Sequence, residues 1–458
     1  MNLSRRSLLK SAAALAVFPT LARSAPLILT AREGAQLIAP PGFPETDIWG
    51  FDGSVPGSPI HLQQGERVQR RLVNELPQAT SVHWHGIRID NAMDGVPGLT
   101  QEAVPSGATF DYDFIVPDAG TYWYHAHNKS VEQVARGLYG PLIVHESEAP
   151  DVEQDLVLML DDWRLDPETA QITQDFDNGH DLSHAGRLGN LTTVNGAFDP
   201  SFPVQQNQRL RLRLVNAANA RVFTVGLDGM SGWIVALDGM PLAEPIPIED
   251  TFPLAPAQRA DLLVDVLAAD AETASLFSQE RDGAFGLARF SVAGQAASTP
   301  RSGVRPLPPN PLPELTDINN VPRHEMRLQG GAMRWLESAR IGETELSGRE
   351  LAQLGRFWAL NGYAERPEDP FLNASLGSVH RIAFVNETVF PHAMHLHGHH
   401  FRLILPDGSF GPWRDTVLVE RGETREIALV TDNPGNWLLH CHMLGHAASG
   451  MMSWYRVT

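Results

Sequence analysis

The chain has 458 residues, of which 43% are hydrophobic and 19% are charged, and its formal net charge is -19. This composition excludes an intrinsically disordered protein and provides for about two to four domains with apolar cores. The acidic balance argues against nucleic acid or an anionic lipid surface as a partner. The single cysteine, Cys441, excludes any intrachain disulfide.

Residues 1–24 are predicted to be a twin-arginine export signal. Arg5 and Arg6 precede an apolar run at 11–18, and a small-residue end follows, with cleavage expected after Ser24. No later segment reaches the ~18 to 20 apolar residues that a membrane span needs. We therefore expect export by the twin-arginine machinery to the periplasm, without stable membrane insertion.

Beyond the signal, short runs of alternating apolar and polar residues dominate, and Gly and Pro separate them. Runs at 68–73, 109–115, 210–215, 260–266 and 425–430 are typical of strands, whereas long helical periodicity is scarce. This pattern predicts an all-β protein built of sandwiches or barrels.

Two segments have the composition of joints between domains. Residues 146–155 are acidic, and residues 299–322 are rich in Pro, Ser and Asn. Cutting there predicts three domains, at 25–147, 148–298 and 323–458, with 299–322 as a Pro-rich linker. The middle domain lacks the histidine arrays that the other two carry, so its expected role is spacing and shaping.

Ten of the 18 histidines fall into four compact arrays. Side chains two residues apart share one face of a strand, so each His-x-His array presents two imidazoles to one centre. One isolated pair is more often an ordinary surface pair, but four arrays, one of them with a cysteine inside, predict metal binding. The arrays are His83 and His85; His125 and His127; His392, His395 and His397; and His440, His442 and His446.

The last array, HCHMLGH, contains the only cysteine and is followed by Met451. A thiolate, imidazoles and a weak thioether suit copper in a blue-copper site. If residues 436–442 form a strand, His440 and His442 point to one face and Cys441 points to the other. One tripeptide would then contact two metal sites.

The motifs HWHG, HAH, HxxHxHG and HCHxxxHxxxxM, in this order, resemble the multicopper oxidases in the three-domain form of bacterial laccases. The resemblance implies three cupredoxin-like (plastocyanin-like) Greek-key β-sandwich domains, a monomer, and four copper ions: one type 1, one type 2 and a type 3 pair. It implies type 2 ligands His83 and His395, and type 3 ligands His85, His125 and His442 on one copper and His127, His397 and His440 on the other. The implied type 1 ligands are His392, Cys441 and His446, with Met451 as the axial group.

In this family a reducing substrate gives single electrons to the type 1 copper, and four electrons reduce dioxygen to water at the other three. The resemblance implies that the substrate meets the edge of His446 or His392 where that ring reaches solvent. Asp94 matches an acid beside the cluster, which implies proton delivery; an ordinary Asp-Gly turn is the alternative. Phenols and aromatic amines are the expected substrates. Oxidation of Mn(II), Cu(I) or Fe(II), a non-catalytic scaffold and copper buffering remain alternatives.

Several positions depart from the family pattern. Ala447 stands where many bacterial members carry a glutamate of the proton path, so that path must differ or be slower. The 11 methionines are scattered, unlike the Met-rich insert of copper-efflux members, which disfavours a dedicated cuprous oxidase. Thr388 replaces an acid of those members, and the run 413–416 is interpreted as structural. The other histidines are interpreted as structural or surface residues: His61, His145, His180, His184, His324, His380, His399 and His400.

Overall fold

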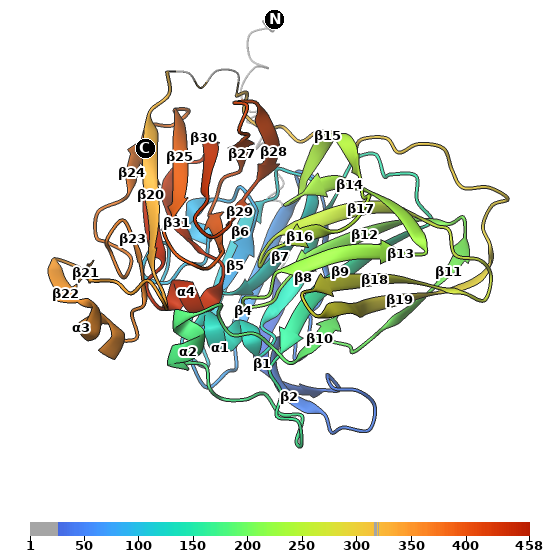
Figure 1. Cartoon of the computed structure of the whole chain (residues 1–458), viewed down its shortest axis with the longest axis horizontal. Helices are drawn as coiled ribbons and strands as arrows, with labels where there is room; N and C mark the ends of the chain where they lie inside the picture. The colour runs from blue at the N-terminus through green and yellow to red at the C-terminus, as the bar shows by residue number, and fades with distance from the viewer. Residues whose placement is uncertain (1–25, 316–317, 319) are drawn as a thin grey trace, which may run out of the picture.

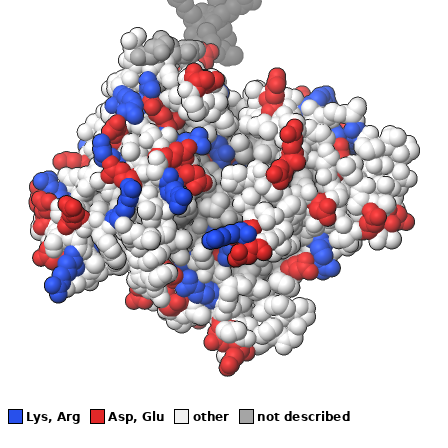
Figure 2. All heavy atoms as spheres, viewed as in Figure 1, with Lys and Arg blue, Asp and Glu red and all other residues white. Residues whose placement is uncertain are grey.

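The computed structural model describes residues 26–315, 318 and 320–458. The predicted export signal lies outside these residues and stays a prediction. In the described ranges no helix has the length and apolar character needed to cross a membrane. Strands dominate the regular structure, which confirms the predicted all-β class (Figure 1). On the face drawn in Figure 2, acidic and basic side chains are interspersed.

The first part of the chain folds into two four-stranded sheets. Its elements are β1 (Leu27–Gln36), β2 (Thr46–Phe51), β3 (Ile60–Gln63), β4 (Arg67–Asn74), β5 (Val82–His85), the 3-10 helix η1 (Asn91–Met93), β6 (Thr109–Ile115), β7 (Gly120–Ala126), α1 (Ser130–Ala135) and β8 (Tyr139–His145). One sheet has the order β2-β1-β4-β6 and the other β3-β8-β7-β5. The runs predicted at 68–73 and 109–115 are therefore present as β4 and β6.

The middle part forms a six-stranded and a five-stranded sheet. Its elements are β9 (Gln154–Trp163), α2 (Gly179–Ser183), β10 (Leu191–Val194), β11 (Ser201–Gln206), β12 (Arg209–Asn216), β13 (Phe223–Asp228), β14 (Met230–Leu237), β15 (Met240–Pro247), β16 (Phe252–Leu254), β17 (Arg259–Val266), β18 (Thr273–Glu280) and β19 (Gly283–Gln295). The sheet orders are β10-β9-β12-β17-β14-β15 and β11-β19-β18-β13-β16.

The third part again forms a six-stranded and a five-stranded sheet, with a small hairpin. Its elements are β20 (Arg323–Gly330), β21 (Ser338–Ile341), β22 (Thr344–Ser347), α3 (Gly348–Gln353), β23 (Trp358–Leu360), β24 (Leu372–Ala374), β25 (Val379–Asn386), β26 (His392–Leu396), β27 (Phe401–Ile404), β28 (Phe410–Arg414), β29 (Thr416–Val419), β30 (Thr424–Val430), β31 (Gly435–Cys441), α4 (Leu444–Ala448) and β32 (Met452–Val457). The sheet orders are β23-β20-β25-β30-β27-β28 and β24-β32-β31-β26-β29.

One strand arrangement recurs in all three parts. The first strand of each part pairs in parallel with a later strand: β1 with β4, β9 with β12, and β20 with β25. Buried apolar side chains of the first and third parts, among them Trp84 and Trp437, form one continuous cluster, whereas the middle part has a core of its own. The sheets that carry the histidine arrays therefore share a core across the junction of the first and third parts.

A buried ion-pair network joins the first part to the middle part. The Arg211 guanidinium, on β12, lies 2.7 Å from a Glu146 oxygen and 2.5 Å from an Asp261 oxygen. All three side chains are almost fully removed from solvent. Burial alone would raise the pKa of Asp261, but Arg211 and Arg213 lower it below its usual range. The network therefore depends on its guanidiniums, because a buried charge without its partner is costly.

We expect the substitution Arg211→Met to lower the free energy of unfolding by about 3–5 kcal/mol, because Glu146 and Asp261 lose their partner. Urea denaturation measures this loss. The contribution of the depressed pKa of Asp261 is present above the unfolded-state pKa of about 4 and is lost as the pH falls through the folded value. The difference in unfolding free energy between the wild type and the variant should therefore become smaller in acid. A difference that became larger would contradict the role assigned to Arg211.

Candidate metal centres

The four histidine arrays meet where the first and third parts face each other. His83 and His85 lie on β5, and His83 is directly opposite His125 on β7. In the third part His395 on β26 is directly opposite His440 on β31. Because residues two apart share a strand face, each pair of strands turns its imidazoles toward the junction.

Rings from the two parts interleave at this junction. The ring centroids of His83 and His397 are 3.9 Å apart, and those of His85 and His395 are also 3.9 Å apart. Neither part of the chain could assemble such a cluster alone. The cluster contains eight imidazoles: His83, His85, His125, His127, His395, His397, His440 and His442.

One close contact inside the cluster fits a bound cation. The Nε2 atoms of His397 and His440 lie 3.1 Å apart. The His397 Nδ1 donates to an Asp94 carboxylate oxygen at 3.0 Å, and the His440 Nδ1 donates to the Cys441 carbonyl at 2.9 Å. A neutral imidazole carries one proton, so both Nε2 atoms present lone pairs to each other. A metal ion between them converts this repulsion into two bonds.

Other rings of the cluster also have one nitrogen in a hydrogen bond and the other nitrogen free to bind a metal. His83 Nδ1 donates to the Asp94 carbonyl at 2.9 Å, and His125 Nδ1 donates to the Ala126 carbonyl at 3.1 Å. Such bonds set the tautomer and leave the opposite nitrogen for a metal. Among the described residues several buried ring nitrogens have no hydrogen-bond partner: His83 Nε2, His85 Nδ1, His125 Nε2, His395 Nε2 and both nitrogens of His442.

Burial holds these imidazoles in the neutral form that binds metals. It lowers the pKa of His85, His125 and His442 well below the usual range, and neighbouring imidazoles lower it further. Ligand atoms come within 4.8 Å of one another in several groups of three. These groups are His83, His395 and His397; His83, His85 and His125; His127, His397 and His440; and His85, His395 and Asp415.

A second centre lies in the third part, at Cys441. The Cys441 Sγ is 3.7 Å from the Nδ1 of His392 and 3.7 Å from the Nδ1 of His446, and these two nitrogens are 3.0 Å apart. The His392 Nε2 donates to the Thr388 hydroxyl at 2.9 Å, which leaves its Nδ1 as a lone pair. Met451 is fully buried, and its carbonyl accepts from the Cys441 amide at 3.1 Å.

Burial raises the pKa of the Cys441 thiol to about 12. The thiol is therefore protonated at neutral pH unless a bound cation displaces the proton, as metals do at coordinating thiols. Cys441 ends β31, between His440 and His442, and its side chain contacts the second centre while theirs join the cluster. This agrees with the alternation expected from a strand.

We expected an edge of the His446 or His392 ring to reach solvent, and this expectation is wrong. His392 and His446 are both 0% exposed. The His446 Nε2 donates to the backbone carbonyl of His184 at 2.6 Å, and the Thr388 hydroxyl covers the His392 Nε2. A segment 262 residues away covers His446, and the local residue Thr388 covers His392, so an electron donor has to dock over one of these coverings.

The middle part contributes to the histidine cluster, although its sequence contains no array. A carboxylate oxygen of Asp415 lies 3.3 Å from the His85 Nε2, and the Asp415 carbonyl accepts from the His395 Nδ1 at 2.9 Å. Arg259, on β17, donates two hydrogen bonds of 2.9 and 2.6 Å to the Asp415 carboxylate. Burial would raise the pKa of Asp415, but Arg259 lowers it well below the usual range.

The middle part therefore supports two cluster histidines and does more than space the others. The run at 413–416 includes Asp415 and was visible as a motif, whereas no pattern around Arg259 marks its role.

Asp94 is buried against two cluster histidines. One carboxylate oxygen accepts from the His397 Nδ1 at 3.0 Å, and the other lies 3.2 Å from the His83 Nδ1. The residue is 0% exposed. This position orients both rings, whereas proton delivery by Asp94 stays a prediction.

We expect Asp94→Ala to weaken copper retention by about tenfold to a hundredfold, because His397 loses the acceptor that fixes its tautomer. Dialysis against a graded chelator, followed by metal analysis, measures this loss. Asp90→Ala is the control, since Asp90 caps η1 from an exposed position nearby. Equal retention in the two variants would contradict the positioning role.

Ala447 borders a cavity of about 360 Å³ that reaches the cluster. Its lining includes His127 and His440, and Lys129 and Arg366 are its charged residues. No carboxylate lines it, so the missing glutamate has no replacement among these lining residues.

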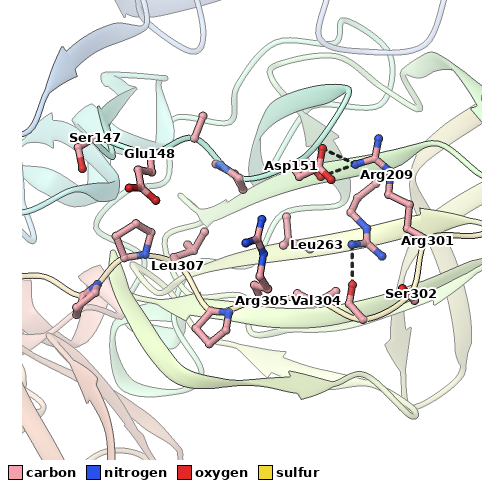
Figure 3. A pocket seen from close by; sticks show the side chains of 16 residues that line it. Ser147, Glu148, Asp151, Arg209, Leu263, Arg301, Ser302, Val304, Arg305 and Leu307 are labelled. Atoms are coloured by element: carbon pink, nitrogen blue, oxygen red, sulfur yellow. Dashed lines mark hydrogen bonds and ion pairs between the residues drawn. The ribbon is translucent and has the colours of Figure 1, made fainter.

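Another cavity lies away from the histidine arrays, and none of the array residues lines it. It measures about 950 Å³ and lies between the connections at 147–151 and 301–309 (Figure 3). Two of its guanidiniums are held by acids: Arg209 by Asp265 and Arg301 by Asp151. No histidine lines it, so the metal chemistry belongs to the junction described above.

Two centres built from neutral imidazoles, joined by the tripeptide His440-Cys441-His442 on an all-β scaffold, define a copper-binding redox protein. Imidazole and thiolate ligands favour copper among the first-row metals. The donor set, the unpartnered ring nitrogens and the facing lone pairs all fit bound copper ions.

Comparison with known proteins agrees with this class. Multicopper oxidase family models match residues 34–149, 154–277 and 343–458. The multicopper oxidase MmcO of Mycobacterium tuberculosis is 30% identical over 446 residues, which cover 90% of this chain and 83% of that protein. Laccase-1 of Botryotinia fuckeliana is 29% identical, over 88% of this chain and 77% of that protein. The chain belongs to the multicopper oxidase family.

Solved structures give the same result. Lac15 from a marine microbial metagenome is 42% identical, covers 94% of this chain and 100% of its own, and superposes with a TM-score of 0.77. A multi-copper oxidase from Pseudomonas thermotolerans is 30% identical, covers 95% and 100%, and has a TM-score of 0.82. The predicted cupredoxin-like fold is confirmed, and the protein is an oxidase that uses copper and takes dioxygen as electron acceptor.

Proposed function

We propose that the protein is a laccase-like oxidase that couples four one-electron oxidations of a reducing substrate to the reduction of dioxygen to two waters. The observation that carries this proposal is the eight-imidazole cluster, with lone pairs facing at 3.1 Å and a His-Cys-His link to a second centre. When bound, copper ions supply the one-electron redox chemistry and the oxygen-binding positions. A single-centre protein could not collect four electrons.

The ligand assignment that we propose uses four copper ions. The neutral tautomers, the unpartnered nitrogens and the burial of the rings support it. His83 and His395 would hold type 2 copper; His85, His125 and His442 would hold one type 3 copper, and His127, His397 and His440 would hold the other; His392, Cys441 and His446, with Met451 as a weak fourth ligand, would hold type 1 copper.

The residues around these ligands hold them and exclude water. Asp94 fixes His397, and Asp415 fixes His395. Trp358 packs its ring 4.2 Å from that of His446, which keeps solvent from the Cys441 centre. Such fixed ligands reduce the rearrangement that accompanies each change of charge.

Phenols and aromatic amines are the first candidate substrates, because outer-sphere donors need only reach the covering over His446. A metal ion such as Cu(I), Fe(II) or Mn(II) is the second candidate. The closed rings of His392 and His446 favour it, since a small cation can dock on the covering itself.

We also propose a periplasmic monomer, exported by the twin-arginine pathway, with cupredoxin domains at 25–147, 148–298 and 323–458. The three recurring sheet pairs and the export motif support this organisation.

The oxidase function is tested by loading the mature protein with copper and measuring oxygen uptake with 2,6-dimethoxyphenol and with ferrocyanide. We expect a blue protein that consumes one dioxygen for every four electrons and releases no peroxide. A colourless protein without oxygen uptake would support a scaffold. A blue protein that binds copper without oxygen uptake would support copper buffering.

A further inference from the structure

The cavity that borders Ala447 has a cationic lining, although the chain is acidic. Its volume is about 360 Å³, and it reaches the cluster at His127 and His440. The charged residues of its lining are Lys129 and Arg366, and no carboxylate lines it. Lys129 is the only lysine beyond residue 10, in a chain with a formal net charge of -19. A positive cavity wall attracts anions and repels cations.

Neither cation forms an ion pair with an acid of the described residues. The Arg366 guanidinium is half-buried and donates to the Gly98 carbonyl at 2.7 Å. Burial lowers the pKa of Arg366, because the attraction of the adjacent Glu365 does not offset the lost hydration. Lys129 is exposed, and Glu132, three residues later, is bound to other side chains. Both cations therefore keep the capacity to bind an external anion.

The backbone holds Lys129 in a fixed position beside the cavity. Lys129 adopts a left-handed conformation with φ of 47°, which is uncommon for a residue with a side chain. Its carbonyl accepts from the Glu132 and Gln133 amides, both at 3.0 Å, and the Asn128 side chain donates to the Ala79 carbonyl at 2.6 Å. Strained backbone of this kind persists only where the surrounding structure imposes it, and it is concentrated at functional sites.

The rest of the lining favours a small ion with little hydration. Apolar side chains form much of the wall, among them Leu438, Leu444 and Met452. Such a wall excludes water and so strengthens the attraction between an anion and the two cations. Dioxygen is neutral and gains nothing from a cationic wall, and metal cations are repelled by it. The lining therefore matches a small monovalent anion.

We propose that Lys129 and Arg366 bind a small monovalent anion, such as a halide, in this cavity, and that the bound anion restricts access to the histidine cluster. The anion is held by side chains of the protein, in contrast to an anion that coordinates copper. Because His127 and His440 line the same cavity, an ion beside the two cations lies between the surface and these rings. The access of dioxygen to the cluster then depends on the anion concentration.

Binding is tested on the copper-loaded protein with chloride and bromide. Crystals soaked in sodium bromide should show a bromide peak in contact with the Lys129 and Arg366 side chains. Chloride titration, followed by the NMR line width of chloride, should give about tenfold weaker binding or more in Lys129→Gln/Arg366→Gln, because this variant removes two charged hydrogen-bond donors. The matched control is Arg281→Gln/Arg421→Gln, which removes the same charge from exposed turns after β18 and β29.

Turnover supplies a second readout. At constant ionic strength, held with a bulky organic sulfonate, we expect chloride to raise KM for dioxygen in the wild type and in the control variant. The chloride concentration that doubles this KM should be about tenfold higher or more in Lys129→Gln/Arg366→Gln. Equal chloride binding in the two variants, or bromide located only on copper, would overturn the proposed site. An equal effect of chloride on KM in the two variants would overturn the control of access.

Discussion

Cys441→Ser should abolish oxygen uptake with every donor and remove the blue colour, while the chain loses one copper ion and keeps the other three. A serine oxygen is a hard ligand that stays protonated, so it cannot replace the thiolate between His392 and His446. His440 and His442 keep their positions, because their rings are held by the cluster rather than by the sulfur. Visible absorption, metal analysis and oxygen uptake on one preparation measure all three effects.

Met451→Leu is the matched control for that experiment. It removes the thioether that we propose as the weak fourth ligand and keeps His392, Cys441 and His446. We expect this variant to remain blue and active, with a shifted reduction potential. A Cys441→Ser protein that still turned over would show that electrons reach the cluster without the cysteine, and it would refute the proposed link.

Arg259→Met should weaken copper binding at the histidine cluster, although the hydrogen bonds of the Arg259 guanidinium go to Asp415 and to backbone carbonyls. The substitution leaves the Asp415 carboxylate buried without its main partner, at a cost of about 3–5 kcal/mol in unfolding free energy. Asp415 then no longer supports His85 and His395, so we expect copper retention to fall by about tenfold to a hundredfold. Chelator dialysis and the paramagnetic resonance signal of the type 2 copper measure this effect.

Arg211→Met separates this positioning effect from general destabilisation. Arg211 is an equally buried arginine of the middle part with two acidic partners, but it lies on the face toward Glu146. Both variants should lose similar stability, and only Arg259→Met should lose copper and change the type 2 signal. Arg259→Lys should rescue part of the loss, because it keeps the charge without the two-pronged geometry. Equal copper content in both methionine variants would refute the role of Arg259.

The strands and the arrays were predictable because their signals are local. The run at 109–115 became β6 with the same bounds, and the run at 425–430 lies within β30. Alternation at period two decides which side chains share a face, so His440 and His442 could be separated from Cys441 before any fold was known. The identity of the metal also followed from residue types alone, since one cysteine among imidazoles favours copper.

The coverings and supports of the centres were not predictable in this way. The contact between His184 and His446 spans 262 residues, and the pair Arg259 and Asp415 spans 156. Neither contact leaves a periodic or spaced pattern in the chain. His184 was interpreted as a structural or surface residue for this reason, and the exposure expected for His446 or His392 was wrong.

Short segments of the sequence thus predict the ligands of this oxidase, because a His-x-His spacing places both imidazoles on one face of a single strand. Only the tertiary structure showed which rings are exposed to solvent, which carboxylates accept their hydrogen bonds, and which segment covers the Cys441 centre. Those properties depend on how the middle part packs against the third, through hydrogen bonds between residues far apart in the chain. The sequence therefore predicts an oxygen-reducing copper protein, and the packing of the middle part against the third determines what covers His446.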